Sequence, residues 1–118
     1  MAPVVLVAED DASVRMTIEF VLQDEGFEVL LAEDGEEALR RALESKPDVI
    51  LLDQIMPKMD GKEVLSALRA DDTTSSIPVL VLTGMGRGEP SDWPGATFVG
   101  KPFSPEMLVE RIREVLAS

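Results

Sequence analysis

Three short, uninterrupted apolar runs constrain the fold of this chain more than any other feature. They are Val4–Ala8, Val49–Leu52 and Val79–Leu82, and each is built from β-branched residues, leucine and alanine. Continuous runs of this kind are typical of parallel strands that helices cover on both faces. Two weaker candidates, Glu28–Ala32 and Thr97–Gly100, bring the expected number of strands to five.

Amphipathic segments lie between these runs and predict four helices. Their apolar residues recur at three- and four-residue intervals, which places them on one face of a helix. Acidic or hydroxyl residues that can cap a helix precede each segment. The apolar faces are Val14, Ile18, Val21 and Leu22; Ala38, Leu39, Ala42 and Leu43; Val64, Leu65 and Leu68; and Leu108, Ile112, Val115 and Leu116, and the caps are Asp11, Asp34, Asp60 and Ser104.

The alternation of strands and helices predicts the fold class. It favours a doubly wound α/β fold, in which a parallel sheet has helices on both sides. We find no internal repeat and no linker, and 118 residues suit one compact unit. Residues 1–118 are therefore expected to form a single domain.

One segment departs from the alternation. Residues 84–96, "GMGRGEPSDWPGA", contain four glycines and two prolines, which oppose a stable helix. A regular α/β pattern would place a helix here. We therefore expect the fourth helix to be shortened or absent.

Composition narrows the possible functions. The formal net charge is −12, from 23 acidic and 11 basic residues, so the surface is expected to repel nucleic acid phosphates and anionic lipid. The chain has no cysteine and no histidine, which excludes disulfides, thiolate nucleophiles and the usual zinc ligands. The apolar run at the N-terminus meets acidic residues too early to be the apolar region of a signal peptide. No apolar run in the chain is long enough to span a membrane. A cytoplasmic setting is expected.

Acidic residues end two of the three strong strands. The first strand runs into Glu9 and Asp10, and the third ends at Asp53. In an open parallel sheet, ligands bind beyond the carboxyl ends of the strands, and neighbouring strands lie roughly 5 Å apart. Oxygen ligands without histidine or cysteine suit a hard cation, and Mg²⁺ above all if a phosphate also binds. The alternative interpretation of each single acid is a helix cap, as expected for Asp11.

Two further strand ends supply what a phosphate requires. The fourth strand ends at Thr83, which offers a hydroxyl group, and the fifth is followed by Lys101, which offers an ammonium group. Each residue alone is a weak signal. Together, the four strand ends predict a phosphorylated carboxylate: Asp53 attacks phosphorus, Mg²⁺ offsets the charge, and Thr83 and Lys101 hold the phosphoryl oxygens.

The chain resembles the receiver domains of two-component response regulators, which belong to the CheY-like superfamily. The resemblance covers essentially all 118 residues and rests on "VLVAEDD", "DVILLDQIMPKMDG", "VLVLTG" and "VGKPF", in this order. It implies a flavodoxin-like sheet of strand order 2-1-3-4-5.

The resemblance also implies roles for individual residues. Asp53 resembles the phosphoacceptor, Asp10 the direct Mg²⁺ ligand, and Glu9 a ligand that acts largely through water. The backbone carbonyl of Ile55 would complete the protein's share of the metal shell. The implied phosphoryl donor is a histidine kinase or a histidine phosphotransfer protein, and the implied output is a conformational change passed to another protein.

The segment between Thr83 and Lys101 sets this chain apart from most relatives. It is shorter by about one helical turn, so the family's usual signalling face is not carried over. Trp93 in this segment either covers the gap left by the helix or forms an exposed anchor for a partner, and we favour the first. Phe98 occupies the place of the family's switching aromatic residue, but it is equally compatible with an ordinary core position.

Two alternative functions remain open. A degenerate receiver would act as a constitutive interaction module, and the altered 84–96 segment is compatible with this. A phosphatase with an aspartyl-phosphate intermediate would need a general acid two residues after the nucleophile, where this chain has Ile55. We therefore expect a signalling domain and not an enzyme, apart from its own phosphorylation and dephosphorylation. No output domain follows Ser118, so either a stand-alone regulator or a fragment of a longer protein is expected.

Overall fold

A computed structural model describes residues 2–54, 56–83, 93, 96–100 and 104–117 of the chain. Within this part, no helix has both the length and the apolar character needed to cross a membrane. The elements, in chain order, are β1 (Val4–Ala8), α1 (Ala12–Asp24), β2 (Glu28–Ala32), α2 (Gly35–Ser45), β3 (Val49–Asp53), α3 (Gly61–Ala70), β4 (Val79–Thr83), β5 (Ala96–Gly100) and α4 (Pro105–Ala117).

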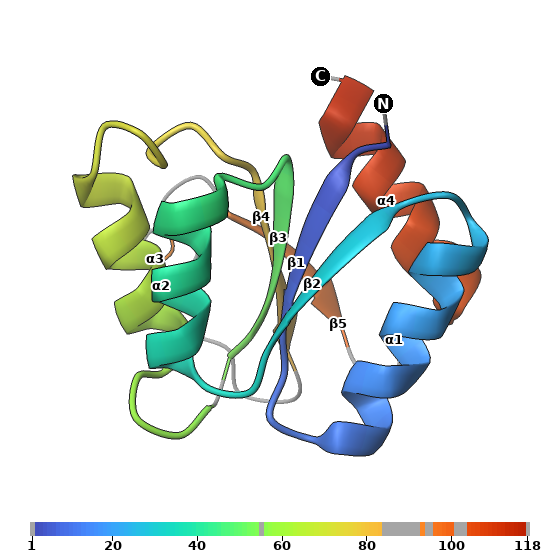
Figure 1. Ribbon diagram of the computed structural model, residues 1–118, viewed down its shortest axis with the longest axis horizontal. Coiled ribbons are helices and arrows are strands. Elements are labelled where there is room, and N and C mark those ends of the chain that lie inside the picture. Colours follow the sequence, from blue (N-terminus) through green and yellow to red (C-terminus); the bar gives the residue numbers. More distant parts are fainter. Residues whose placement is uncertain (1, 55, 84–92, 94–95, 101–103, 118) are drawn as a thin grey trace.

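The five strands form one parallel sheet of order β2-β1-β3-β4-β5, which confirms the predicted fold and strand order (Figure 1). The central strand β3 is buried along its whole length. Parallel strands have helical crossovers on their faces, so a central strand meets side chains from both sides. This explains why the sequence of β3 shows no polar alternation.

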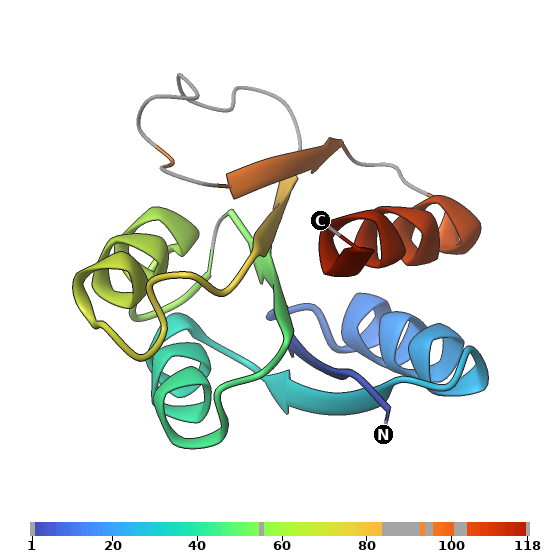
Figure 2. The same cartoon turned by 90° about the horizontal axis from the view of Figure 1, so that it is seen from above.

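The helices form two layers, with α1 and α4 on one face of the sheet and α2 and α3 on the other (Figures 1 and 2). Successive residues of β1 point to opposite layers: Val5 and Val7 pack under α1 and α4, and Leu6 and Ala8 pack under α2 and α3. The predicted apolar faces supply both cores, with buried residues Ile18, Leu22, Leu108 and Ile112 on one side and Ala38, Ala42, Val64, Leu65 and Leu68 on the other.

The predicted helix caps are present. The Asp11 and Asp34 carboxylates accept hydrogen bonds from backbone N–H groups of the first turns of α1 and α2. At the start of α3, Asp60 and Glu63 form a reciprocal capping box, with hydrogen bonds of 2.9 and 3.1 Å. The Ser104 hydroxyl accepts a hydrogen bond from the third residue of α4. These caps fix where each helix leaves the carboxyl edge of the sheet.

The segment expected to carry the shortened or absent helix, residues 84–96, lies outside the described residues except for Trp93 and Ala96. The Trp93 side chain is 4% exposed and packs edge-on against Phe98 of β5, with ring centroids 5.8 Å apart. Trp93 therefore belongs to the core under α2 and α3, so it is not an exposed anchor. Whether it covers a gap left by the fourth helix stays a prediction, because residues 84–92 and 94–95 lie outside the described residues. Phe98 is half-buried and packs against the same core.

Gly35, the first residue of α2, lies against the loop that follows β3. Its N–H donates a hydrogen bond to the Pro57 carbonyl over 3.3 Å, and a methyl group placed on its Cα would overlap the carbonyl oxygen of Met59. A side chain at this position would therefore push the loop away from the helix.

We predict that Gly35→Ala lowers the free energy of unfolding by about 2–3 kcal/mol, because the loop backbone must shift to make room. Urea denaturation measures this. Gly100→Ala is the matched control: a methyl group there meets no atom within 4 Å, so a change within about 0.5 kcal/mol is expected. Equal losses in the two variants would contradict the steric explanation.

Candidate functional site

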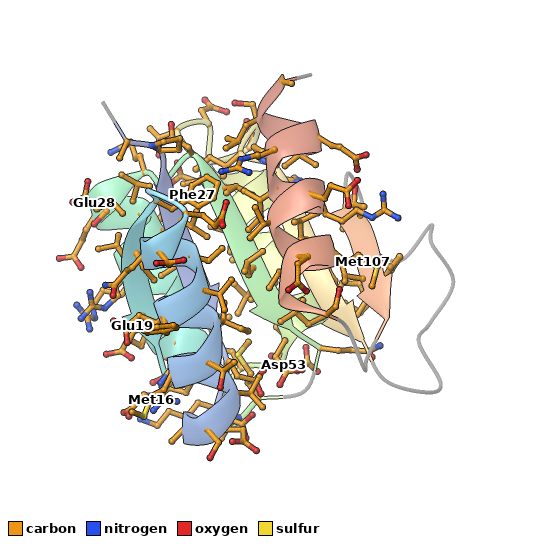
Figure 3. All side chains as sticks on the ribbon, turned by 90° about the vertical axis from the view of Figure 1, so that its right-hand side faces the viewer. Met16, Glu19, Phe27, Glu28, Asp53 and Met107 are labelled. Carbon is orange, nitrogen blue, oxygen red and sulfur yellow. The ribbon has the colours of Figure 1, made fainter. Side chains whose placement is uncertain are left out.

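Three carboxylates meet at the carboxyl edge of the sheet. Glu9 and Asp10 follow β1 directly, and Asp53 is the last residue of the neighbouring strand β3. One carboxylate oxygen from each lies within 4.8 Å of the other two. Figure 3, which is viewed from the side of α1 and α4, shows Asp53 at the end of the sheet. The predicted convergence of these acids is therefore present.

The three acids differ in their access to water. Glu9 and Asp53 are only 2% and 7% exposed, whereas Asp10 is exposed. Like charges at this separation repel one another, and burial strengthens the repulsion because less water screens it. A hard cation with oxygen ligands would offset the repulsion, and carboxylates are the ligands that Mg²⁺ and Ca²⁺ prefer. The donor set of this cluster thus fits such an ion.

Arg15 of α1 holds the loop that carries Glu9 and Asp10. Its Nη1 donates hydrogen bonds to the backbone carbonyls of Glu9, at 2.8 Å, and of Asp10, at 3.4 Å. Its Nη2 pairs with the Glu33 carboxylate at the end of β2, at 3.2 Å. The Arg15 side chain is only 11% exposed. The guanidinium group therefore binds the backbone of Glu9 and Asp10, which follow β1, and connects it to Glu33, which follows β2.

Sequence reasoning missed Arg15. The available signal was a basic residue near the start of an otherwise apolar-faced helix, four residues after the last of three consecutive acids. Helix periodicity alone places this residue near the loop but does not show that its donors reach backbone carbonyls. That contact depends on how α1 packs on the sheet.

Gly61 allows α3 to pack directly on the backbone of Asp53. A methyl group on Gly61 would lie 2.5 Å from the Asp53 carbonyl oxygen and 3.2 Å from the Gln54 Cα. The Gly61 N–H donates to the Gln54 carbonyl over 3.0 Å, and the Gln54 N–H donates to the Leu82 carbonyl of β4 over 3.1 Å. These contacts fix the carbonyl of Asp53 and the residue that follows it.

The loop between β3 and α3 also contacts the start of α2. Lys58 has a left-handed backbone conformation, with φ of 70°, and its ammonium group lies 3.6 Å from the Asp34 carboxylate. The hydrogen bond from the Glu37 N–H, helped by Lys58, holds the pKa of Asp34 below its usual value of 3.8. A lowered pKa means that this interaction stabilises the fold above that value and is lost as the pH falls through the lower, folded-state pKa.

Of the remaining predicted site residues, Thr83 lies at the same edge. In the ladder between β3 and β4, Asp53 pairs with Leu82, so Thr83 is one residue beyond it on the next strand. Thr83 pairs in turn with Gly100, the last residue of β5. Lys101, which follows Gly100 in the sequence, and Ile55 lie outside the described residues. The strand register therefore brings the end of β4 beside the acids and leads β5 to the same edge.

Comparison with known proteins agrees with this geometry. The family model of the response regulator receiver domain matches residues 5–113. The phosphate regulon transcriptional regulatory protein PhoB of Escherichia coli is 38% identical over 98% of this chain and 52% of its own length. The chain spans about half the length of the curated relatives that it matches.

Two solved structures have the same fold over their whole length. A putative response regulator from Chloroflexus aurantiacus superimposes with a TM-score of 0.92 at 31% identity, with 100% of both chains covered. The receiver domain of a sensor histidine kinase from Pseudomonas aeruginosa has a TM-score of 0.90 at 25% identity, again with 100% of both chains covered. That second structure has a magnesium ion coordinated in its active site cleft.

We predict that Asp10→Asn raises the free energy of unfolding by about 1 kcal/mol in EDTA, because it removes one of three repelling charges. Mg²⁺ should remove this advantage, since the wild type gains more from the ion. Urea denaturation with and without Mg²⁺ measures both effects. Asp72→Asn, at an exposed position in the loop after α3, is the control. A stabilisation equal to that of the control would contradict charge repulsion at the cluster.

We further predict that Arg15→Met lowers the free energy of unfolding by about 2 kcal/mol, because it leaves the part-buried Glu9 carbonyl without its charged donor. Arg111→Met is the matched control, since it removes only an exposed ion pair with Glu114 and should cost less than about 0.5 kcal/mol. If the two variants are equally stable, Arg15 does not hold the loop in the way described.

Proposed function

Since this chain belongs to the family of response regulator receiver domains, we propose that it takes a phosphoryl group on Asp53. The donor would be a histidine kinase or a histidine phosphotransfer protein, and the step would depend on Mg²⁺. The observation that carries the proposal is the cluster of Glu9, Asp10 and Asp53, whose oxygens lie within 4.8 Å of one another at the carboxyl edge of the sheet.

We propose that the acids hold Mg²⁺ in different ways. Asp10 and Asp53 would bind it directly, Glu9 largely through water, and the backbone carbonyl of Ile55 would complete the protein's share of the shell. When bound, Mg²⁺ supplies positive charge that offsets the carboxylates and the phosphoryl oxygens. The support for this assignment is the donor set itself, which consists of oxygen atoms only.

In the proposed transfer, an Asp53 carboxylate oxygen forms a bond to phosphorus while the bond from phosphorus to the donor's histidine nitrogen breaks. The Thr83 hydroxyl and the Lys101 ammonium group would hold the phosphoryl oxygens. Two features support a rigid nucleophile: Asp53 ends a fully buried strand, and Gly61 packs against its backbone. Rigidity matters because the attacking oxygen must be aligned with the leaving nitrogen.

We propose that residues 1–118 act as a single receiver domain that signals by conformational change and catalyses only its own phosphorylation and dephosphorylation. The downstream partner would be a protein, since the net charge of −12 disfavours contact with nucleic acid phosphates. The cytoplasmic setting stays a prediction. The alternative is a degenerate receiver that acts as a constitutive interaction module and does not cycle phosphate.

We predict that acetyl phosphate with Mg²⁺ adds one phosphoryl group to the protein, detected by intact mass spectrometry. The addition should be absent from Asp53→Asn and from samples with EDTA, because both remove a component of the transfer. Beryllofluoride should change the fluorescence of Trp93 in the wild type only. Modification that persists in Asp53→Asn would contradict the assignment of the acceptor. A folded wild-type protein that shows no response at all would favour the degenerate alternative.

A further inference from the structure

The guanidinium group of Arg15 contacts the main chain of the loop that supplies two of the three clustered acids. The ladder between β1 and β2 continues as far as the Glu9 N–H, which donates to the Ala32 carbonyl over 3.1 Å. Just beyond this bond, Nη1 of Arg15 donates to the carbonyls of Glu9 and Asp10, at 2.8 and 3.4 Å. Helix α1 therefore holds the loop at Asp10, the exposed member of the cluster.

Glu33 connects this contact to the loop on the other side of the cluster. Its carboxylate pairs with Nη2 of Arg15 at 3.2 Å. Two residues further along the chain, the Gly35 N–H donates to the Pro57 carbonyl over 3.3 Å. Pro57 lies in the loop that follows Asp53. The turn between β2 and α2 is thus joined to both loops that carry the acids, and Arg15 makes one of the two connections.

The charge of Arg15 alone would oppose a cation at the cluster, because like charges repel. Its pairing with Glu33 leaves the two side chains together without net charge. What remains is the directed hydrogen bonding of the planar guanidinium group, which reaches two carbonyls and one carboxylate at once. This geometry favours a role in holding the loop over a purely electrostatic role.

We propose that Arg15 is a positioning residue for a divalent cation at the acidic cluster. It fixes the main chain of Asp10 so that the Asp10 carboxylate stays where one ion can bridge it to Asp53. Mg²⁺ demands nearly ideal octahedral geometry, so a displaced ligand weakens its binding. Loss of a group that orients a metal ligand typically lowers metal affinity about 10–100-fold. The proposal rests on the proposed binding of Mg²⁺ by this cluster.

Titration with Mn²⁺ tests the proposal without any phosphoryl donor, because the electron paramagnetic resonance signal of the free ion measures its affinity for the protein. Positioning and charge predict opposite results for Arg15→Met. If Arg15 holds Asp10 in place, the variant binds Mn²⁺ about tenfold more weakly than the wild type. If Arg15 acts through its charge alone, removing a cation strengthens binding. Unchanged or tighter binding by Arg15→Met would overturn the proposal.

Arg15→Lys keeps the positive charge but lacks the forked donors that reach both the loop and Glu33. We expect it to bind Mn²⁺ about threefold more weakly than the wild type, between the wild type and Arg15→Met. This variant also serves if Arg15→Met does not fold. In that case, a folded lysine variant that binds as tightly as the wild type would overturn the proposal.

Two control variants separate positioning from other effects of a substitution, and circular dichroism verifies that each protein is folded in the titration buffer. Arg111→Met removes the same charge from an exposed ion pair on α4. Thr74→Val removes a buried hydrogen bond to the Leu68 carbonyl, at 2.7 Å, and so lowers stability away from the cluster. Both should keep the Mn²⁺ affinity within about twofold of the wild type. A loss in either control as large as that in Arg15→Met would overturn the proposal.

Asp10→Asn distinguishes failure of this proposal from failure of the proposed function. It should weaken Mn²⁺ binding, because it removes a negative charge from the cluster. If the wild type does not bind Mn²⁺ at about 10 mM, or if Asp10→Asn binds it equally well, the cluster is not the cation site and both proposals are overturned. If Asp10→Asn binds more weakly but Arg15→Met does not, only the role of Arg15 is overturned.

Discussion

Repulsion among Glu9, Asp10 and Asp53 governs how the carboxyl edge of the sheet is built. Three carboxylates whose oxygens lie within 4.8 Å of one another, two of them buried, oppose folding unless positive charge reaches them. A structure that served stability alone would not retain this arrangement. The surrounding contacts are consistent with this view, since Arg15 and Gly61 fix the backbone of the acids and leave their carboxylates facing a shared space.

Much of the fold could be predicted from the sequence because its signals are local. A strand buried on both faces needs an apolar residue at every position, and β3 shows this directly. Capping residues such as Asp60 and Glu63 mark a helix start through hydrogen bonds within four residues of chain. The convergence of the acids also followed, because parallel strands that end in acids bring those acids to one edge.

Other features depend on packing between distant elements, and the sequence could not reveal them. Arg15 reaches the carbonyl of Glu9 only because α1 lies at a particular angle on the sheet. The need for glycine at position 35 comes from Met59, which lies in the loop after another strand. The cavity that α1 and α4 line together requires that these helices, about 80 residues apart in the sequence, lie side by side on one face.

The cluster at the carboxyl edge offers rigid oxygen ligands in a confined space, which suits a small cation and a phosphoryl group. The strand register brings the ligands together, because Glu9 and Asp10 follow β1 and Asp53 ends the neighbouring strand β3.

Anomalous diffraction from crystals soaked in Mn²⁺ would show whether the three acids hold a divalent cation together, because Mn²⁺ replaces Mg²⁺ at oxygen sites and can be located without bias. We expect one strong peak bounded by the carboxylates of Asp10 and Asp53, with Glu9 within reach of a water on the ion. Saturating Mn²⁺ that gives no peak among these three residues, or carboxylates that turn away to separate solvent positions, would contradict it.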